Sequence, residues 1–446
     1  MANTTLTHTA SSGNSKTWTF SAWIKLAKSD GYEYLFSQGS SGSTFIGIYL
    51  GNDNTFRCYN EDSGSQTLYF KTNRLLRDPN GWYHIVVKCD TTQSTEADRF
   101  KIYINGIQET SFESADYPAQ NSNTNMNTNS TIQRIGVYNP TGSNANHYFD
   151  GYMSHVALVD GAALTPTSFG ETDSTSGIWK FKSPSGVTWG TNGVHLKFES
   201  SGNLGLDSSG NSNTFTVNGN GRQSLDTPTN VYTTLNSLNS WGLNVLSNSN
   251  LTITNTGTDA AHTQNTMHMN KGKWYMEFNI DAHGAGGSAP MFILAGTGAY
   301  QQQQTGFSTS GDGAYGIGSN GRSITDGVES GSVVFTELTA GDKVQIAFDA
   351  DAGKAWFGVN GTYLGSGNPS TAANPYFTTT KLQNNDVSLT ILGYGTTNKA
   401  SCNFGSGYFG TTAITSAGSN GNGSLFEYDV PSGYYALNTK NLNTYG

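Results

Sequence analysis

Charged residues, cysteines and long hydrophobic runs are all scarce in this sequence, and each scarcity excludes a class of protein. Only 12% of the 446 residues are charged, so few stretches offer the Glu, Lys and Leu that helix interiors favour. The 23 Lys and Arg residues form no basic run, and the formal net charge is −9. Nucleic-acid binding needs clustered positive charge, so nucleic acid is not expected as a partner.

Only three cysteines are present: Cys58, Cys89 and Cys402. They cannot all pair within one chain, and their spacing matches no metal-binding motif. No stretch of about 18 consecutive apolar residues occurs, so no membrane insertion is expected. Residues 1–8 carry neither the basic segment nor the apolar stretch of a secretory signal.

Glycine, polar side chains and aromatic rings are what the sequence does contain. It has 55 Gly, and 12% of its residues are Phe, Trp or Tyr. That aromatic content argues against disorder, while the helix-poor composition favours strands joined by polar loops. A chain of this length can form two or three domains with their own cores. We therefore predict an all-β protein.

Two segments predict β-hairpins. Asn105-Gly106 interrupts the alternating segment 100–108, and Asn360-Gly361 interrupts the segment 354–363. Asn-Gly between alternating apolar residues is a strong hairpin signal, because both central residues of a type I′ turn need positive φ.

A period of two marks several further strands. In residues 17–25, Trp18, Phe20 and Ile24 lie on one face. The same alternation occurs at 83–89, 100–104, 135–138 and 148–160. Many short strands separated by turns predict an antiparallel sandwich.

Four motifs resemble those of the concanavalin A-like, laminin G-type jelly roll and occur in that family's order. The motifs lie at residues 20–25, 81–87, 103–106 and 149–157, the last followed by Ala-Leu-Thr-Pro at 163–166. The resemblance covers residues 1–168 and implies a lectin-type β-sandwich.

Laminin G-type domains often hold calcium through carboxylates and backbone carbonyls, so the resemblance makes calcium the cofactor to look for. Such a site needs several hard oxygen ligands. Asp53, Asp150 and Asp160 are the candidates at loops or strand ends. None of them lies in a dense acidic cluster, so a solvated or turn-capping Asp is the alternative.

Residues 169–225 predict a β-rich connector with strand candidates at 178–181, 193–198 and 214–217. The connector could complete the first sandwich or cap the second, and both possibilities stay open. Residues 121–130 form a polar stretch without aromatics, where we expect a solvated loop.

Residues 226–446 make up the second predicted domain. Its alternating segments 272–280 and 341–349, with Trp356-Phe-Gly-Val-Asn-Gly361 and Asn403-Phe-Gly405, resemble the ordered core motifs of a SPRY sandwich. The expected fold is therefore all-β, with two antiparallel β-sandwich (jelly-roll) domains joined by the connector.

The order laminin G-like, connector, SPRY-like is similar to tail-fibre and other virion proteins of marine bacteriophages. The resemblance implies a virion-surface protein, assembled in the host cytoplasm, that binds a host cell-surface glycan and other virion proteins. Fibre proteins are commonly symmetric, so a trimer or higher homo-oligomer is expected. A purely structural capsid or tail decoration is the main alternative, because SPRY domains generally bind proteins.

A polysaccharide-degrading enzyme is a third possibility, which the sequence disfavours. A retaining glycosidase needs two carboxylates about 5–5.5 Å apart, which on this fold lie on one strand as Glu-x-Asp-x-(x)-Glu. The pairs at 96–98, 171–173 and 427–429 lack the second Glu, and no Gly-x-Ser-x-Gly or His-Glu-x-x-His segment occurs. We therefore predict a non-enzymatic protein.

Sugar recognition combines an aromatic platform with amide and carboxylate groups. Loops on a rigid β scaffold concentrate binding residues, and two loops offer this chemistry; solvated polar loops are the alternative. The predicted glycan-binding residues are Tyr300, Gln301, Gln302 and Gln303 in one loop, and His147 and Tyr148 in the other.

Overall fold

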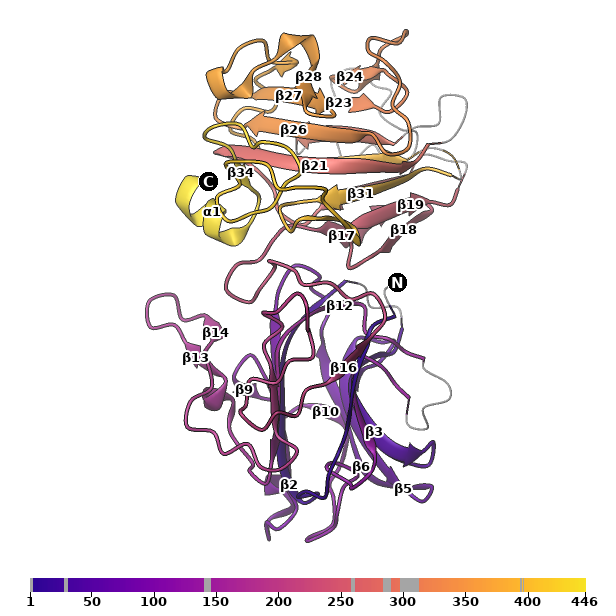
Figure 1. Cartoon of the computed structure of the whole chain (residues 1–446), viewed down its shortest axis with the longest axis vertical. Helices are drawn as coiled ribbons and strands as arrows, with labels where there is room; N and C mark the ends of the chain where they lie inside the picture. The colour runs from indigo at the N-terminus through magenta and orange to yellow at the C-terminus, as the bar shows by residue number, and fades with distance from the viewer. Residues whose placement is uncertain are drawn as a thin grey trace. The chain divides into compact units, whose positions relative to one another are not determined.

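The computed structural model describes residues 3–27, 31–139, 146–257, 261–283, 290–296, 313–393, 395 and 397–446. The chain divides into two compact units, unit 1 (Met1–Gln223) and unit 2 (Ser224–Gly446). Strands make up nearly all of the regular structure (Figure 1), which confirms the predicted all-β fold. In the described ranges, no helix has the length and apolarity to cross a membrane.

Unit 1 is a sandwich of two antiparallel sheets. Within the described residues, the larger sheet has the order β10 (Phe112–Asp116), β6 (Ser65–Leu75), β5 (Thr55–Asp62), β4 (Thr44–Leu50), β3 (Glu33–Ser41), β11 (Ile132–Ile135), β1 (Thr5–Thr9), β16 (Thr216–Asn218). The smaller sheet has the order β15 (Val194–Leu196), β12 (Gly151–Asp160), β2 (Thr17–Leu26), β7 (Tyr83–Asp90), β8 (Phe100–Ile104), β9 (Ile107–Gln108). Strands that are distant in the sequence are therefore neighbours, as in a jelly roll.

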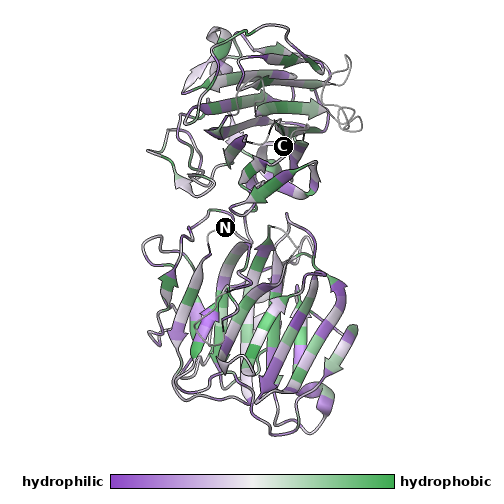
Figure 2. Cartoon of the chain, turned by 90° about the vertical axis from the view of Figure 1, so that its right-hand side faces the viewer, coloured by the Kyte–Doolittle hydropathy of each residue, from purple (hydrophilic) through white to green (hydrophobic). Residues whose placement is uncertain are grey.

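The core of unit 1 fills the space between these sheets. Because side chains alternate along a strand, Trp18 and Phe20 of β2 point inward and share a core with Phe70 of the larger sheet. The predicted inward faces of 83–89 and 100–104 belong to the same core. Figure 2 shows the resulting polar and apolar bands along the strands.

The connector belongs to unit 1. β15 extends the smaller sheet by pairing with β12, and β16 extends the larger sheet by pairing with β1. Ahead of them, β13 (Gly170–Thr172) and β14 (Trp179–Phe181) form a hairpin, whose Trp179 stacks on His84 of the smaller sheet. The sequence left open whether the connector completes the first sandwich or caps the second, and in the structure it completes the first.

The polar stretch at 121–130 is solvated only in part: residues 121, 123 and 128–130 are exposed, as expected, whereas Thr124, Met126 and Asn127 are buried. Met126 is fully buried in the core of unit 1. The Asn125 amide donates to the carbonyl of Glu61 at 2.6 Å, and the Asn127 amide donates to Asp160 at 3.1 Å. Asn amides supply both donors and acceptors, so an Asn-rich segment can be buried when each amide has a partner.

Unit 2 is a second sandwich. Within the described residues, one sheet has the order β17 (Leu235–Trp241), β20 (Ala261–Asn265), β30 (Val387–Gly393), β22 (Met291–Gly296), β23 (Ala314–Gly318), β24 (Ser323–Thr325), β25 (Val328–Glu329). The other has the order β18 (Asn244–Ser247), β19 (Thr252–Asn255), β31 (Lys399–Asn403), β21 (Lys273–Ala282), β26 (Lys343–Asp349), β27 (Lys354–Val359), β28 (Thr362–Tyr363), with β29 (Phe377–Thr378) beside β27 and β34 (Tyr435–Ala436) beside β21. The predicted inward residues Trp274, Met276 and Phe278 lie in the core between them.

The remaining short elements lie outside these sheets. They are the strand pair β32 (Tyr408–Phe409) and β33 (Thr412–Ala413), the 3₁₀ helices at Glu96–Asp98, Pro166–Ser168, Leu364–Ser366 and Pro369–Thr371, and the α-helix α1 (Thr439–Tyr445). Asn438 caps α1, because its side chain accepts a hydrogen bond from the backbone N–H of Asn441.

Both predicted Asn-Gly hairpins are confirmed. Asn105 (φ 50°) and Gly106 (φ 79°) join β8 to β9, and Asn360 (φ 48°) and Gly361 (φ 85°) join β27 to β28. All four have the positive φ that a type I′ turn requires. The Asn105 side chain also accepts a hydrogen bond of 2.8 Å from the backbone N–H of His84, which ties the turn to β7.

A buried carboxylate organises the C-terminal part of unit 2. Glu277 of β21 accepts hydrogen bonds from the backbone N–H groups of Glu427 (2.8 Å) and Tyr428 (2.9 Å) and from the Tyr275 hydroxyl (2.9 Å). Burial raises the pKa of Glu277, while these donors oppose the shift. The carboxylate thus attaches an irregular segment, distant in sequence, to the central strand.

Candidate functional site: an aromatic face and a polar pocket in unit 1

The residues predicted to bind glycans fall in two places. Tyr300 and residues 301–303 lie outside the described residues, so that prediction stays open. His147 is exposed and has a φ of 54°, and Tyr148 beside it is half-buried. The His147 ring lies 5.2 Å from that of Tyr32, edge to face. His147 therefore joins an aromatic cluster.

That cluster lies on the outer face of the larger sheet of unit 1. Ile46 and Ile48 of β4 point into the core, so the residues that alternate with them point outward. The register places Tyr34 opposite Tyr49 across β3 and β4. We call this surface the tyrosine face; its rings are those of Tyr34, Phe45, Tyr49, Tyr59, Tyr69, Tyr138 and His147.

Tyr34 is the centre of the tyrosine face. Its ring stacks on Tyr49, with centroids 4.5 Å apart and an interplanar angle of 8°, and Tyr138 packs on it at 4.9 Å. A Cβ atom at Gly47 would lie 2.8 Å from Cε1 of Tyr34, so only glycine leaves room for this ring. Burial raises the pKa of Tyr34 and of Tyr49, so both hydroxyls stay protonated at neutral pH.

Charged residues beside the tyrosine face neutralise one another. Asp53 Oδ2 lies 2.7 Å from Arg57 Nη2 and 3.1 Å from Lys71 Nζ, and Lys71 also pairs with Glu113 at 2.6 Å. Burial acts to raise the pKa of Asp53, but hydrogen bonds from Thr55 and Lys71 outweigh it and hold that pKa well below its usual range. Two cations and two carboxylates form one network without net charge.

Tyr59 adds a polar group to the face. Its hydroxyl donates to Glu61 Oε2 at 2.8 Å. Burial and this hydrogen bond raise the pKa of Tyr59 to about 12, so the hydroxyl is protonated at neutral pH. A half-buried ring and a carboxylate acceptor therefore lie side by side.

The tyrosine face has the extent and chemistry of a binding surface for an extended ligand. It crosses four adjacent strands, β3 to β6, which at about 4.8 Å between strands spans about 14 Å. Tyr34, Phe45 and Tyr49 are buried and support the others, whereas Tyr59, Tyr69 and Tyr138 are half-buried and His147 is exposed. The half-buried tyrosines present both an apolar surface and hydrogen-bonding groups. Such a surface can stack on the C–H faces of sugars and bind their hydroxyls.

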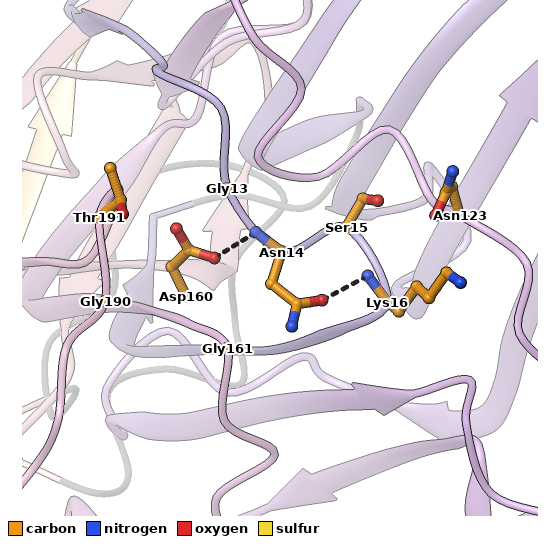
Figure 3. A pocket seen from close by; sticks show the side chains of 9 residues that line it. All are labelled: Gly13, Asn14, Ser15, Lys16, Asn123, Asp160, Gly161, Gly190 and Thr191. Atoms are coloured by element: carbon orange, nitrogen blue, oxygen red, sulfur yellow. Dashed lines mark hydrogen bonds between the residues drawn. The ribbon is translucent and has the colours of Figure 1, made fainter.

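A polar pocket of about 520 Å³ lies in the loops at the end of β12 (Figure 3). We call it the Asp160 pocket; its lining comes from residues 13–16, Asn123, residues 160–161 and residues 190–191. Asp160 is buried, and its Oδ1 accepts from the backbone N–H of Asn14 (2.7 Å) and the amide of Asn127 (3.1 Å). Its Oδ2 accepts from the backbone N–H and the amide of Asn192, at 3.0 and 3.2 Å.

The three Asp residues proposed as calcium ligands do not form one site. Asp160 is surrounded by N–H donors, whereas calcium takes oxygen ligands. Asp150 precedes β12 and Asp160 ends it, so they lie about 30 Å apart at 3.3 Å per residue. Asp53 belongs to the ion-pair network with Arg57. Among the described residues no three His, Cys, Asp or Glu side chains group as a metal site would require, and calcium binding stays a prediction.

Two of the carboxylate pairs considered for catalysis form surface ion pairs. Asp98 lies 2.7 Å from Lys101. Lys180 lies 3.5 Å from Glu171 and 3.0 Å from Asp173. Asp98, Glu171 and Asp173 are therefore each paired with a lysine.

The tyrosine face was not predicted from the sequence. Its signal was present: Phe45, Gly47 and Tyr49 occupy every second position of one strand, and Tyr59 and Tyr69 occupy outward positions of the next two. Only the register between strands shows that these positions meet.

Comparison with known proteins finds low similarity to solved structures, and no curated protein matches in sequence. The SPRY domain of human HERC1 is similar at 13% identity over 38% of this chain and 96% of that chain, with a TM-score of 0.30. A SAP-like pentraxin from Limulus polyphemus is similar at 18% identity over 36% and 71% of the two chains, with a TM-score of 0.27. The CBM40 of Ruminococcus gnavus IT-sialidase, bound to α2,3-sialyllactose, is similar at 14% identity over 31% and 73%, with a TM-score of 0.23.

One family matches in sequence, over a part of unit 1. That part contains every strand that carries the tyrosine face. Residues 2–168 match the concanavalin A-like lectin/glucanases superfamily, in its laminin G-type branch, which confirms the resemblance predicted for residues 1–168.

Proposed function

We propose that this chain is a non-enzymatic, lectin-like protein that binds a glycan on the tyrosine face of unit 1. The row of rings across β3 to β6 carries the proposal. Ligand sites combine aromatic surface with a few placed polar groups, and here the polar groups are tyrosine hydroxyls and Glu61. Arg57 and Lys71 beside the face are paired with Asp53 and Glu113, so neither cation is free to attract an acidic sugar, and the face suits a neutral stretch of glycan chain.

The family match of residues 2–168 supports a lectin-like role for unit 1. That superfamily also includes glucanases, so the match alone does not separate binding from hydrolysis. The ion pairs of Asp98 and Asp173 favour binding, because they engage carboxylates that a glycosidase would need free.

The proposed setting is a bacteriophage virion, where the chain would be a tail fibre or another surface appendage that adsorbs to a host-cell glycan. The order of the laminin G-like and SPRY-like motifs supports this setting. A structural decoration protein is the second candidate. Leu238, Leu243 and Val245 on and between β17 and β18 of unit 2 are 63%, 62% and 52% exposed, and exposed apolar side chains of this kind favour protein contacts.

Binding of the labelled full chain to a panel of bacterial cells and their extracted polysaccharides tests the proposal, with and without EDTA. We expect selective, saturable binding to one polysaccharide. Loss of binding in EDTA would add calcium to the site. Absence of binding by the folded chain would contradict glycan recognition and favour the structural candidate.

Variants of Tyr59 locate the site. Tyr59→Ala removes a half-buried ring and should weaken polysaccharide binding about tenfold or more. Tyr59→Phe keeps the ring, loses only the hydrogen bond to Glu61, and should weaken binding less. Tyr445→Ala, in α1 of unit 2, is the matched control and should leave binding unchanged. Equal binding by Tyr59→Ala and the unmodified chain would exclude the tyrosine face.

A further inference from the structure

The Asp160 pocket contains several polar groups that the fold itself does not use. Within the residues that the structure describes, Ser15 and Thr191 accept side-chain hydrogen bonds only at their backbone carbonyls, and the side chains of Ser15, Asn123 and Thr191 make none. Lys16 makes no ion pair there either. In Figure 3, Lys16 and Asn123 lie toward one side of the view and Asp160 and Thr191 toward the other, with Asn14 and Ser15 between them.

The floor of the pocket is fixed before any ligand arrives. Asp160 is held by four N–H contacts from three asparagines, and the Asn14 side chain accepts from the backbone N–H groups of Lys16 and Thr17, both at 2.9 Å. A Cβ atom at Gly13 or at Gly190 would collide with Asp160. Two glycines thus allow the loops to close around this carboxylate.

The charges in the pocket are not equivalent. Both oxygens of Asp160 already accept hydrogen bonds, and hydrogen bonds from N–H groups compensate a buried carboxylate. The Lys16 ammonium has no such compensation within the described residues. The pocket therefore offers one uncompensated positive charge next to hydroxyl and amide groups.

We propose that the Asp160 pocket is a second ligand site, for a single acidic sugar residue of the uronic acid class. The sugar carboxylate pairs with Lys16, and the ring hydroxyls bond to Ser15, Asn123 and Thr191. A volume of about 520 Å³ lies within the range of small-ligand sites, about 300–1,000 Å³. The inference rests on the proposed function, because it gives the glycan-binding unit a second site of different charge preference.

Ligand-detected saturation-transfer NMR on the full chain tests this inference with two probes, methyl β-glucuronide and methyl β-glucoside. The probes differ only in the carboxylate. We expect saturation transfer to the glucuronide, weakened about fivefold by Lys16→Ala, since an exposed ion pair contributes up to about 1 kcal/mol. Lys16→Arg should keep the response, added salt should weaken it, and Lys440→Ala in unit 2 is the matched control.

Two results would overturn the inference: equal responses to both probes, or a glucuronide response that Lys16→Ala leaves unchanged. No transfer to the glucuronide at about 10 mM, ten times a millimolar Kd, would overturn it as well. The tyrosine face is tested apart from the pocket, because Tyr59→Ala should reduce polysaccharide binding and spare the glucuronide response. Polysaccharide binding without a glucuronide response would contradict the pocket inference alone. A glucuronide response without polysaccharide binding would contradict glycan binding on the tyrosine face alone.

Discussion

Trp179 Nε1–H donates a hydrogen bond of 2.9 Å to Nδ1 of His84. An indole N–H can only donate, so Nδ1 is the acceptor and the imidazole proton is on Nε2, which lies 2.9 Å from Ser21 Oγ. The other neighbour is Trp23, whose ring stacks on His84 at 4.6 Å. His84 is therefore a neutral histidine between two tryptophans, one from the sandwich and one from the connector.

The stability of unit 1 should fall as the pH is lowered from about 6.5 to about 4. Burial lowers the pKa of His84 from 6.5 to about 3. Burial is also the main reason why the pKa values of His155 and His195 fall to about 4; His195 and Lys197 add to the shift of His155, and Lys197 adds to that of His195. In this window the unfolded chain binds protons that the folded chain does not, so lower pH favours unfolding. For His84 the slope is about 1.4 kcal/mol per pH unit.

Denaturant unfolding of the full chain between these pH values measures the slope. His84→Gln is the informative variant, because a glutamine amide carries an acceptor and a donor, as the neutral imidazole does, but does not titrate. Its slope should be shallower than that of the unmodified chain even where its stability is lower. An identical slope in both proteins would show that His84 takes up its proton over the same pH range in the folded and the unfolded chain, which would contradict a lowered pKa.

Gly47→Ala should displace the Tyr34 ring. The added methyl group would lie 2.8 Å from Cε1 of Tyr34, and overpacking of this kind costs about 1–3 kcal/mol. We expect a lower melting temperature in calorimetry and weaker polysaccharide binding. Gly42→Ala is the matched control, because nothing lies within 4 Å of a Cβ at that position. Equal melting temperatures for the two variants would contradict the packing described for Tyr34.

Glu277→Gln should loosen the C-terminal segment of unit 2. Both carboxylate oxygens accept from backbone N–H groups, so an amide must turn its NH₂ toward one donor. An unmade buried hydrogen bond costs about 1–3 kcal/mol. We expect faster hydrogen exchange at the amides of Glu427 and Tyr428, with no change for the exposed Glu337→Gln. Unchanged exchange in Glu277→Gln would mean that other contacts hold this segment.

Local patterns in the sequence sufficed for β2, β7 and β8 and for both Asn-Gly turns, whereas β3 to β6 were not predicted and the strand expected at 135–138 lies at Ile132–Ile135. The alternation in residues 17–25 identified the inward face of β2, because a strand with one buried face repeats every two residues. Positive φ at Asn105 and Asn360 followed from the turn type. These features depend on neighbours in the chain, which a sequence displays directly.

The candidate site depends on neighbours in space, and there the sequence was insufficient. Tyr34 and Tyr49 are fifteen positions apart and meet through the β3–β4 register, and Asp160 meets Asn14 across 146 positions. Burial of Met126 was unforeseen for the same reason, since composition describes a segment's own polarity and not the partners that its amides find. His147 was found because it is adjacent to Tyr148 in a loop, and not for its contact with the tyrosine rings.

The pairing of β1 with β16 has a consequence for the synthesis of this protein. β1 leaves the ribosome before the other strands of unit 1, and one of its edges stays unpaired until residues 216–218 emerge. These residues follow the family-matched segment by about 50 positions, which takes about 3–10 s at 5–20 residues per second. An open strand edge is a template for aggregation, and a fragment ending at residue 168 would keep that edge permanently. The connector strand β16 therefore covers, in the finished chain, an edge that stays open during synthesis.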